Sequence, residues 1–119
     1  MLNLDTHILI HALTGSLRSS ERAALEGERW GISAIVLWEL AWLQEHGRIE
    51  LDFDSPEFQR VLSRVHIWPL DLKVCRQATR LDFNSDPADQ LIAATSIVYS
   101  VPLLTRDRKI RKSALVPLA

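Results

Sequence analysis

The stretch that decides the fold runs from residue 86 to residue 105 and reads DPADQLIAATSIVYSVPLLT. Its first residues are typical of a helix start, because Asp86 can act as the N-cap and Pro87 fits the first helical position. The spacing predicts a helix that continues to about Tyr99. Residues 101–105 are short and apolar, which predicts a buried strand directly after the helix. A helix that leads into a short buried strand is the building unit of a parallel α/β sheet.

The same alternation extends over the rest of the chain. Strands are expected at residues 1–4, 30–33, 66–70 and 101–105, with a last edge strand at 114–118. Further helices are expected from Asp5 to Gly15, from Ser19 or Ser20 to near Gly27, from Ala34 to about His46, from Ser55 through Val65, and from Leu72 to Leu81. We therefore expect residues 1–119 to form one α/β domain, a three-layer α/β/α sandwich around a central, mostly parallel sheet of four to five short strands.

Composition is that of a globular protein. The chain has 119 residues, of which 47% are hydrophobic and 24% charged, a balance that supports a core and excludes disorder. No stretch is long and apolar enough to cross a membrane, and the first residues lack the pattern of a signal peptide. The single cysteine, Cys75, excludes an internal disulfide and is expected to fill space in the core. We therefore expect a cytoplasmic protein without a membrane partner.

Charge is unevenly distributed along the chain. Residues 1–60 contain five arginines against ten acidic residues, whereas residues 61–119 contain nine basic residues against five acidic ones. The basic excess concentrates in residues 106–112, RDRKIRK. Such a patch can hold the backbone of a polyanion such as RNA, and a solvated helix or loop explains it equally well. The candidate RNA-binding residues are Arg106, Arg108, Lys109, Arg111 and Lys112.

Four acidic residues stand where a parallel sheet gathers its functional groups. Asp5 is expected at the end of the first strand, Asp107 just after the fourth, and Asp89 in the first turn of the helix from residue 86. Glu39 is the only charge in an otherwise apolar helix, so its carboxylate needs a partner from elsewhere in the fold. Because sites in open α/β sheets form beyond the carboxyl ends of the strands, we expect these four side chains to lie together.

Each acid also has a structural explanation. Asp5 and Asp86 can cap helices, and Asp89 suits the positive end of a helix dipole. Asp107 and Glu39 can pair with arginines. A single cause explains the whole set better, since clustered carboxylates raise one another's pKa values unless a cation neutralises them. Oxygen ligands without thiolates favour Mg²⁺ or Mn²⁺ over zinc, and such ions can activate water at a phosphodiester.

Histidine and tryptophan residues receive mainly structural interpretations. His7 and His11 are four residues apart, but Ile8 stands where the zincin pattern requires glutamate, so no zinc site is expected. His7, two residues from Asp5, is expected to line the acidic pocket and touch the substrate. Trp38 and Trp42 are expected to pack in the core or at a dimer face, and not to stack on nucleic-acid bases.

Five segments, in their order along nearly the whole chain, resemble the PIN domain and, more narrowly, the VapC-type ribonuclease toxins of bacterial toxin–antitoxin pairs. The segments are Leu4-Asp5-Thr6-His7, Ser33-Ala34-Ile35 leading to Trp38-Glu39-Leu40, Gly47-Arg48-Ile49-Glu50-Leu51, Asp86-Pro87-Ala88-Asp89 with Leu91-Ile92-Ala93-Ala94-Thr95, and Pro102-Leu103-Leu104-Thr105-Arg106-Asp107. Each segment alone is a weak signal, and the ordered set is specific. One departure is Gln90, where many relatives carry arginine, which can weaken an anchoring salt bridge or a substrate contact.

The resemblance implies a Mg²⁺ or Mn²⁺ site formed by four acids, with neighbouring residues in support. The acids are Asp5, Glu39, Asp89 and Asp107; the supporting residues are Thr105, Thr6 and His7, with Asp86 as an accessory acid or cap. It further implies an endoribonuclease that cleaves single-stranded regions of RNA, commonly forms homodimers and is blocked by the C-terminal segment of a cognate antitoxin. The alternatives are a PIN-type nuclease that processes RNA or acts on DNA, and an inactive PIN-like scaffold that only binds a partner.

Overall fold

The computed structural model describes all residues from 1 to 119 and contains a four-stranded parallel sheet. The strands are β1 (Leu2–Leu4), β2 (Trp30–Ser33), β3 (His66–Trp68) and β4 (Leu103–Leu104). They lie in the order β3-β2-β1-β4, and each neighbouring pair is parallel. All four carboxyl ends therefore point to the same edge of the sheet, and β1 and β4 end side by side.

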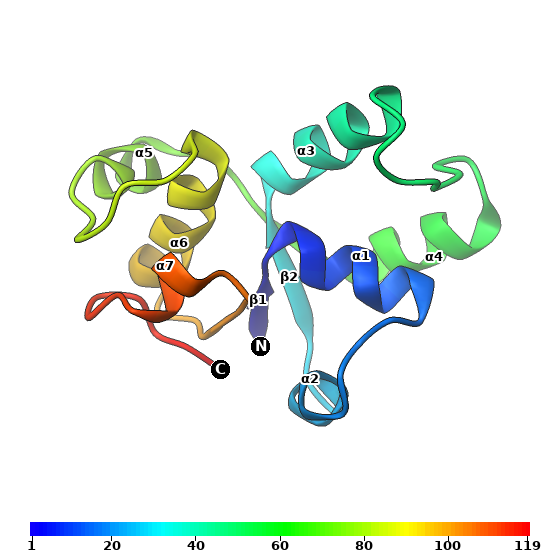
Figure 1. Ribbon diagram of the computed structural model, residues 1–119, viewed down its shortest axis with the longest axis horizontal. Helices are drawn as coiled ribbons and strands as arrows, with labels where there is room; N and C mark the ends of the chain where they lie inside the picture. The colour runs from blue at the N-terminus through cyan, green and yellow to red at the C-terminus, as the bar shows by residue number, and fades with distance from the viewer.

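Helices cover both faces of this sheet (Figure 1). They are α1 (Thr6–Thr14), α2 (Ser19–Leu25), α3 (Ala34–Glu45), α4 (Pro56–Arg64), α5 (Leu72–Ala78), α6 (Pro87–Tyr99) and α7 (Arg108–Arg111). In Figure 1, α5, α6 and α7 lie on one side of β1 and β2, and α1, α3 and α4 lie on the other. The expected α/β class with a central parallel sheet is confirmed.

Several helices begin at the capping residue expected from the sequence. Asp5, Ser33 and Ser55 each accept a hydrogen bond from a backbone N–H in the first turn of α1, α3 and α4. Such bonds satisfy donors that have no partner inside the helix. Helix α2 differs, because its N-cap position is Arg18, and Ser19 is already the first helical residue.

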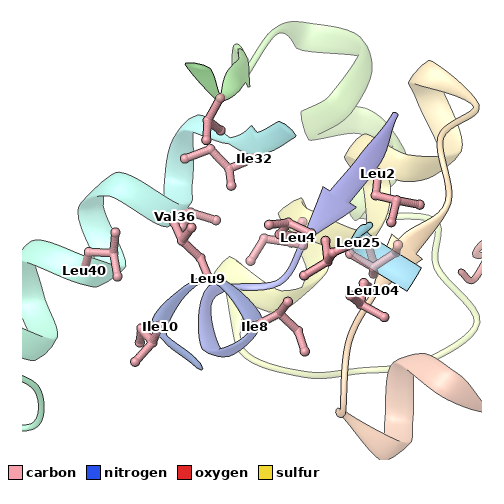
Figure 2. Packing of buried hydrophobic residues seen from close by; sticks show 14 of the residues in the cluster. Leu2, Leu4, Ile8, Leu9, Ile10, Leu25, Ile32, Val36, Leu40 and Leu104 are labelled. Carbon is pink, nitrogen blue, oxygen red and sulfur yellow. The ribbon is translucent and has the colours of Figure 1, made fainter. Parts of the chain in front are cut away.

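One hydrophobic core joins the strands to the helices on both faces (Figure 2). Leu4 of β1, Ile32 of β2, Val36 of α3 and Ile92 of α6 are fully buried. Figure 2 shows how side chains of β1, α1 and α3 meet in its centre. This shared core fixes the starts of α1, α3 and α6 relative to the ends of the strands. None of the helices has the length and apolar character needed to span a bilayer.

The sheet has four of the expected four to five strands, because residues 114–118 do not form the predicted edge strand. Residues 114–118 form only one isolated bridge, between Leu103 and Leu118. Only the last residues of this segment pair with β4: the Leu103 N–H donates to the carbonyl of Pro117 at 2.9 Å, and the Ala119 N–H donates to the carbonyl of Leu103 at 3.0 Å. The start of the segment bonds to Asp82 instead, which accepts from the Ser113 hydroxyl at 2.6 Å and from the Ala114 N–H at 2.8 Å. Strands β3 and β4 are also shorter than predicted, since the prolines at 69 and 102 have no N–H to donate to a neighbouring strand.

Two residues expected in the core lie at the surface. Trp38 and Trp42 are 58% and 42% exposed, so core packing is the wrong interpretation, while the dimer-face alternative stays a prediction. Helix α3 is apolar on all sides, but only one of its sides faces the core. Val36 and Leu40 on that side are therefore its only buried residues. Cys75 is likewise only partly buried and does not fill the core.

Candidate active site

The four predicted acids come from four different elements at the carboxyl edge of the sheet. Asp5 follows β1 directly, Asp107 lies three residues after β4, and Asp89 is in the first turn of α6. These three line one cavity of about 330 Å³, here called the acidic cavity, whose lining residues are Asp5, His7, His11, Asp89, Arg106 and Asp107. Glu39 of α3 lies beside it and interacts electrostatically with Asp5 and Asp89. The structure thus brings the four acids into one neighbourhood.

Asp5 is the most deeply buried of the four, with only 6% of its surface exposed. Its Oδ1 accepts a hydrogen bond from the Thr6 N–H at 2.8 Å, and its Oδ2 accepts one from the Thr105 hydroxyl at 2.6 Å. Burial raises the pKa of Asp5, and the negative charge of Asp107 raises it further, while these two hydrogen bonds lower it. The Thr105 hydroxyl and the backbone N–H of Thr6 therefore hold this carboxylate in place.

Glu39 is half-buried, and its carboxylate has a hydrogen-bond partner from another helix, as expected for an isolated charge in an apolar helix. That partner is the Thr6 hydroxyl of α1, which donates a short hydrogen bond to Glu39 Oε1. Since a hydroxyl is neutral, it leaves the charge of the carboxylate uncompensated. Burial raises the pKa of Glu39, and the charges of Asp89 and Asp5 add to this effect.

Asp89 is held by the loop that precedes its helix. The Ser85 hydroxyl donates a hydrogen bond to Asp89 Oδ2 at 2.9 Å. Burial raises the pKa of Asp89 despite this bond, and repulsion from Asp5 and Asp107 contributes in the same direction. The position of Asp89 in the first turn of α6 is as expected.

Asp86 does not perform the capping expected of it. Its backbone occupies the N-cap position of α6 and its carbonyl accepts a hydrogen bond from the Gln90 N–H, but its side chain caps nothing. The exposed carboxylate instead lines a hollow of about 510 Å³ between α3 and the start of α6. This apolar hollow is lined by Ile35, Trp38, Glu39, Trp42, Asp86, Pro87, Ala88 and Leu91.

Gln90 stands where many relatives carry arginine, and here its side-chain amide anchors the loop before α6. Its Nε2 donates to the carbonyl of Ala78 at 3.0 Å, and its Oε1 accepts from the N–H of Ser85 at 3.1 Å. The amide thereby ties the end of α5 to the loop that carries Ser85. A neutral side chain performs the anchoring here without a salt bridge.

Sequence reasoning missed an ion pair beside the acidic cavity, between the buried Glu21 and the partly exposed Arg106. Glu21 of α2 is 6% exposed, and its two oxygens accept from Arg106 Nη2 at 2.6 Å and Arg106 Nε at 2.7 Å. This arginine lowers the pKa of Glu21 to about 2. Arg106 Nη1 also lies 3.0 Å from His11 Nε2, which must be the acceptor because a guanidinium only donates. The Arg106 guanidinium is therefore engaged within the chain, and no local pattern signals a pair 85 residues apart.

The remaining basic residues of the segment 106–112 lie on or just after α7. Asp107 caps this helix by accepting from the Ile110 N–H at 3.0 Å, and so pairs with neither neighbouring arginine. Arg108, Lys109, Arg111 and Lys112 are exposed. Two of them also hold the backbone, since Arg111 Nη1 donates to the carbonyl of Thr105 at 3.3 Å and the Lys109 ammonium donates to the carbonyl of Asn84 at 3.2 Å.

The donor set fits a hard divalent cation. No three Asp, Glu, His or Cys side chains stand together closely enough to hold an ion as they are now placed. However, Mg²⁺ commonly binds through one or two carboxylates and keeps several waters, so it does not need three converging side chains. Burial and mutual repulsion raise the pKa values of Asp5, Glu39 and Asp89, and a cation among them would relieve both effects.

Comparison with known families decides the assignment. The sequence model of the PIN domain matches residues 3–115. The chain belongs to the PIN-domain family. This PIN domain is 34% identical over 114 residues to Ribonuclease VapC22 of Mycobacterium tuberculosis, a match that covers 91% of the chain and 88% of that protein. The resemblance to the VapC-type members expected from the sequence is confirmed.

Solved structures show the same fold. A toxin-antitoxin complex from Klebsiella pneumoniae matches this PIN domain with a TM-score of 0.71 at 21% identity, over 94% of this chain and 91% of that one. VapBC2 from Rickettsia felis, bound to a DNA fragment from their promoter, matches with a TM-score of 0.72 at 23% identity, over 100% of this chain and 98% of that one. These likenesses extend over 94% and 100% of the chain, respectively.

Proposed function

We propose that this PIN domain is a Mg²⁺-dependent endoribonuclease, the toxin of a type II toxin–antitoxin pair. The observation that carries the proposal is the meeting of Asp5, Glu39, Asp89 and Asp107 at the carboxyl edge of the sheet, with three of the four pKa values raised. Similarity to Ribonuclease VapC22 supports RNA as the substrate. The chain would act in the cytoplasm, where its RNA is found.

The four acids would hold Mg²⁺ or Mn²⁺. Such an ion supplies an activated water for attack on phosphorus and offsets negative charge on the leaving oxygen. Asp5, Glu39 and Asp89 are the principal ligands in this proposal, and Asp107 completes the site directly or through water. Manganese suits the same oxygen donors.

The surrounding residues orient these acids. The Thr105 and Thr6 hydroxyls each donate to one carboxylate, to Asp5 and Glu39 respectively, and so leave other oxygens available as ligands. His7 is exposed at the mouth of the acidic cavity, where its imidazole can contact the RNA near the scissile phosphate. The exposed Arg108, Lys109, Arg111 and Lys112 would attract the RNA backbone.

Cleavage of RNA by an Asp89→Asn variant tests the proposal. We expect purified wild-type protein to cleave RNA with Mg²⁺ and not with EDTA, and the variant to lose cleavage while keeping its circular dichroism spectrum. Asp54→Asn is the matched control, since Asp54 is exposed and lies outside the acidic cavity. Full activity of Asp89→Asn would refute the proposed site.

The same assay separates the alternatives. A nuclease that acts on DNA would cleave single-stranded DNA in preference to RNA of the same sequence. An inactive scaffold would cleave neither and would show no heat of Mg²⁺ binding in calorimetry. The raised pKa values of three neighbouring acids favour an ion-binding site over a scaffold. Mapping cleavage sites in total RNA after inducing wild type and Asp5→Ala in parallel would identify the target.

The proposed antitoxin would cover the apolar hollow and reach the acidic cavity. Exposure of Trp38 and Trp42 beside Glu39 and Asp86 supports a partner with apolar and basic side chains. VapBC and other toxin-antitoxin complexes among the similar structures support the same class of partner. Trp38→Lys should weaken co-purification with the product of an adjoining antitoxin gene.

A second copy of the chain is the other proposed partner. Ile67, Leu70 and Leu72 are exposed apolar residues at edge strand β3 and the start of α5, and their exposure supports a homodimer. Light scattering after size exclusion measures the mass directly. Leu72→Glu should shift a dimer toward monomer, and a wild-type protein that is monomeric at high concentration would exclude this partner.

A further inference from the structure

A second cavity adjoins the acidic cavity at Arg106. It has a volume of about 460 Å³ and is here called the arginine cavity. Four arginines line it: Arg18, Arg106, Arg108 and Arg111. Ser20 and Thr105 are also among the lining residues. They come from the start of α2, the segment after β4, and α7. No basic-rich stretch of sequence includes Arg18, so only the fold reveals this cluster.

The arginine cavity carries uncompensated positive charge. Glu21 is the only acidic side chain that lines it, and Arg106 already neutralises Glu21. The C-terminal residue Ala119 also lines the cavity, and its carboxylate forms no ion pair with an arginine. No carboxylate of the chain lies within ion-pair distance of Arg18, Arg108 or Arg111. Three guanidinium groups around one cavity repel one another, and an anion among them would remove that repulsion.

The planar guanidinium group matches the geometry of two kinds of anion, carboxylate and phosphate, and the proposed RNA substrate supplies phosphate. The guanidinium N–H fork donates two parallel hydrogen bonds to phosphate oxygens, which makes arginine the preferred residue for phosphate recognition. Ser20 adds a hydroxyl to the lining of the same cavity, whereas the Thr105 hydroxyl is already bonded to Asp5. The chemistry therefore fits a phosphate group and disfavours an apolar or cationic ligand.

The two cavities share a wall. Arg106 lines both of them, and Thr105 lines the arginine cavity while its hydroxyl bonds to Asp5 in the acidic cavity. A ligand phosphate in the arginine cavity would thus lie next to the proposed site of cleavage. A single RNA strand can place one phosphate at the acids and another a short distance along its backbone in the arginine cavity.

We propose that the arginine cavity binds a backbone phosphate of the RNA substrate near the scissile bond, with Arg18, Arg108 and Arg111 as its ligands. The inference rests on the proposed function for its substrate class. It adds Arg18 of the α2 region to the expected basic residues, and it separates Arg108 and Arg111 from Lys109 and Lys112, which do not line the cavity. The Lys109 ammonium instead donates to the carbonyl of Asn84 at 3.2 Å.

Binding of single-stranded RNA without divalent ions tests the inference apart from catalysis. Fluorescence anisotropy with a labelled RNA oligonucleotide in EDTA gives the dissociation constant at several NaCl concentrations. Arg18→Ala should weaken binding about tenfold at low salt, as expected for one charge-assisted contact. It should also lower the slope of log K against log salt by about 0.7, the value for one phosphate contact on a single strand.

Arg22→Ala is the matched control, because Arg22 is exposed on the same helix and does not line the cavity. Both variants should fold, since the backbone N–H of Arg18, and not its side chain, bonds to Glu21. With Mg²⁺, Arg18→Ala should raise KM for RNA several-fold and leave kcat nearly unchanged. Equal affinities and salt slopes for Arg18→Ala and Arg22→Ala would overturn the inference, even if the wild type cleaves RNA. A wild type that cleaves no RNA refutes the proposed function, whatever the anisotropy shows.

Discussion

The hydroxyl of Thr105 donates a hydrogen bond of 2.6 Å to Oδ2 of Asp5, across 100 positions of sequence. The same oxygen of Thr105 accepts from the N–H of Asp107 at 3.0 Å. One buried hydroxyl therefore links the ends of the neighbouring strands β1 and β4 and sets the positions of two of the four acids. Its removal should affect ion binding more than it affects the fold.

Thr105→Val replaces this hydroxyl with a methyl group of similar shape. The bond lowers the pKa of Asp5, so its loss should raise that pKa further and weaken Mg²⁺ binding near neutral pH. Loss of the buried hydrogen bonds should cost about 1–2 kcal/mol of stability. We expect the Mg²⁺ concentration for half-maximal RNA cleavage to rise several-fold. Thr105→Ser keeps the hydroxyl and should behave like wild type; an unchanged Mg²⁺ requirement in Thr105→Val would contradict this role.

Crowding of the acids should destabilise the protein when no divalent ion is present. The pKa of Asp89 is raised on folding, so the folded state binds its proton more tightly than the unfolded state. The stability that this proton provides is fully present below the unfolded pKa, near 3.8, and is lost as pH rises through the folded pKa. In EDTA at pH 7, Asp89→Asn should therefore be more stable than wild type, because it removes the charge that burial and the neighbouring acids disfavour.

Urea denaturation at several pH values measures this difference. The advantage of Asp89→Asn should shrink toward pH 4, and addition of Mg²⁺ should raise the melting temperature of wild type but not of the variant. Asp54→Asn serves as the control for loss of one surface charge. A variant less stable than wild type in EDTA at pH 7 would show that the acids do not repel one another.

The positions of the four acids could be predicted because each depends on a local pattern. Asp5 and Asp107 follow short apolar strands, Asp89 follows a helix-start signal, and Glu39 is an isolated charge in an apolar run. The rule that sites form at the carboxyl ends of parallel strands then placed them together. Parallel pairing itself followed from the alternation of short strands with helices.

Other features depend on contacts that no local pattern encodes. The Glu21–Arg106 pair joins α2 to the segment after β4, so neither residue signals the other. The exposure of Trp38 and Trp42 could not be read from α3, because a helix that is apolar on all sides indicates no preferred face. The C-terminal segment does not form a strand because its first N–H groups bond to the Asp82 carboxylate and the Ser113 hydroxyl, which leaves only its last residues to pair with β4.

Glu21→Gln tests the missed ion pair. The variant keeps the size of the side chain but leaves the Arg106 guanidinium without a charged partner, which should cost about 2 kcal/mol. Arg106 lowers the pKa of Glu21 from 4.5 to about 2, so the pair stabilises the fold above pH 4.5 and loses this effect as pH falls toward 2. The difference in unfolding free energy between wild type and Glu21→Gln should therefore be constant from pH 7 to 5 and shrink below.

Glu26→Gln at the exposed end of the same helix is the control and should change stability little at any pH. If Glu21→Gln and Glu26→Gln had the same small effect in urea denaturation, Glu21 and Arg106 would not form a stabilising pair in solution.

Gly31 of β2 should tolerate no side chain, because a Cβ at this position would collide with the indole ring of Trp68. β2 pairs with β1 and β3, so its backbone cannot move away, and Trp68 is itself buried. Gly31→Ala should cost about 1–3 kcal/mol through overpacking.

Trp68→Leu also destabilises the protein on its own, since it leaves a cavity, but it makes room for the methyl group of Gly31→Ala. In a double-mutant cycle by urea denaturation, the two costs should be clearly less than additive. Additive costs would mean that Trp68 does not lie on Gly31.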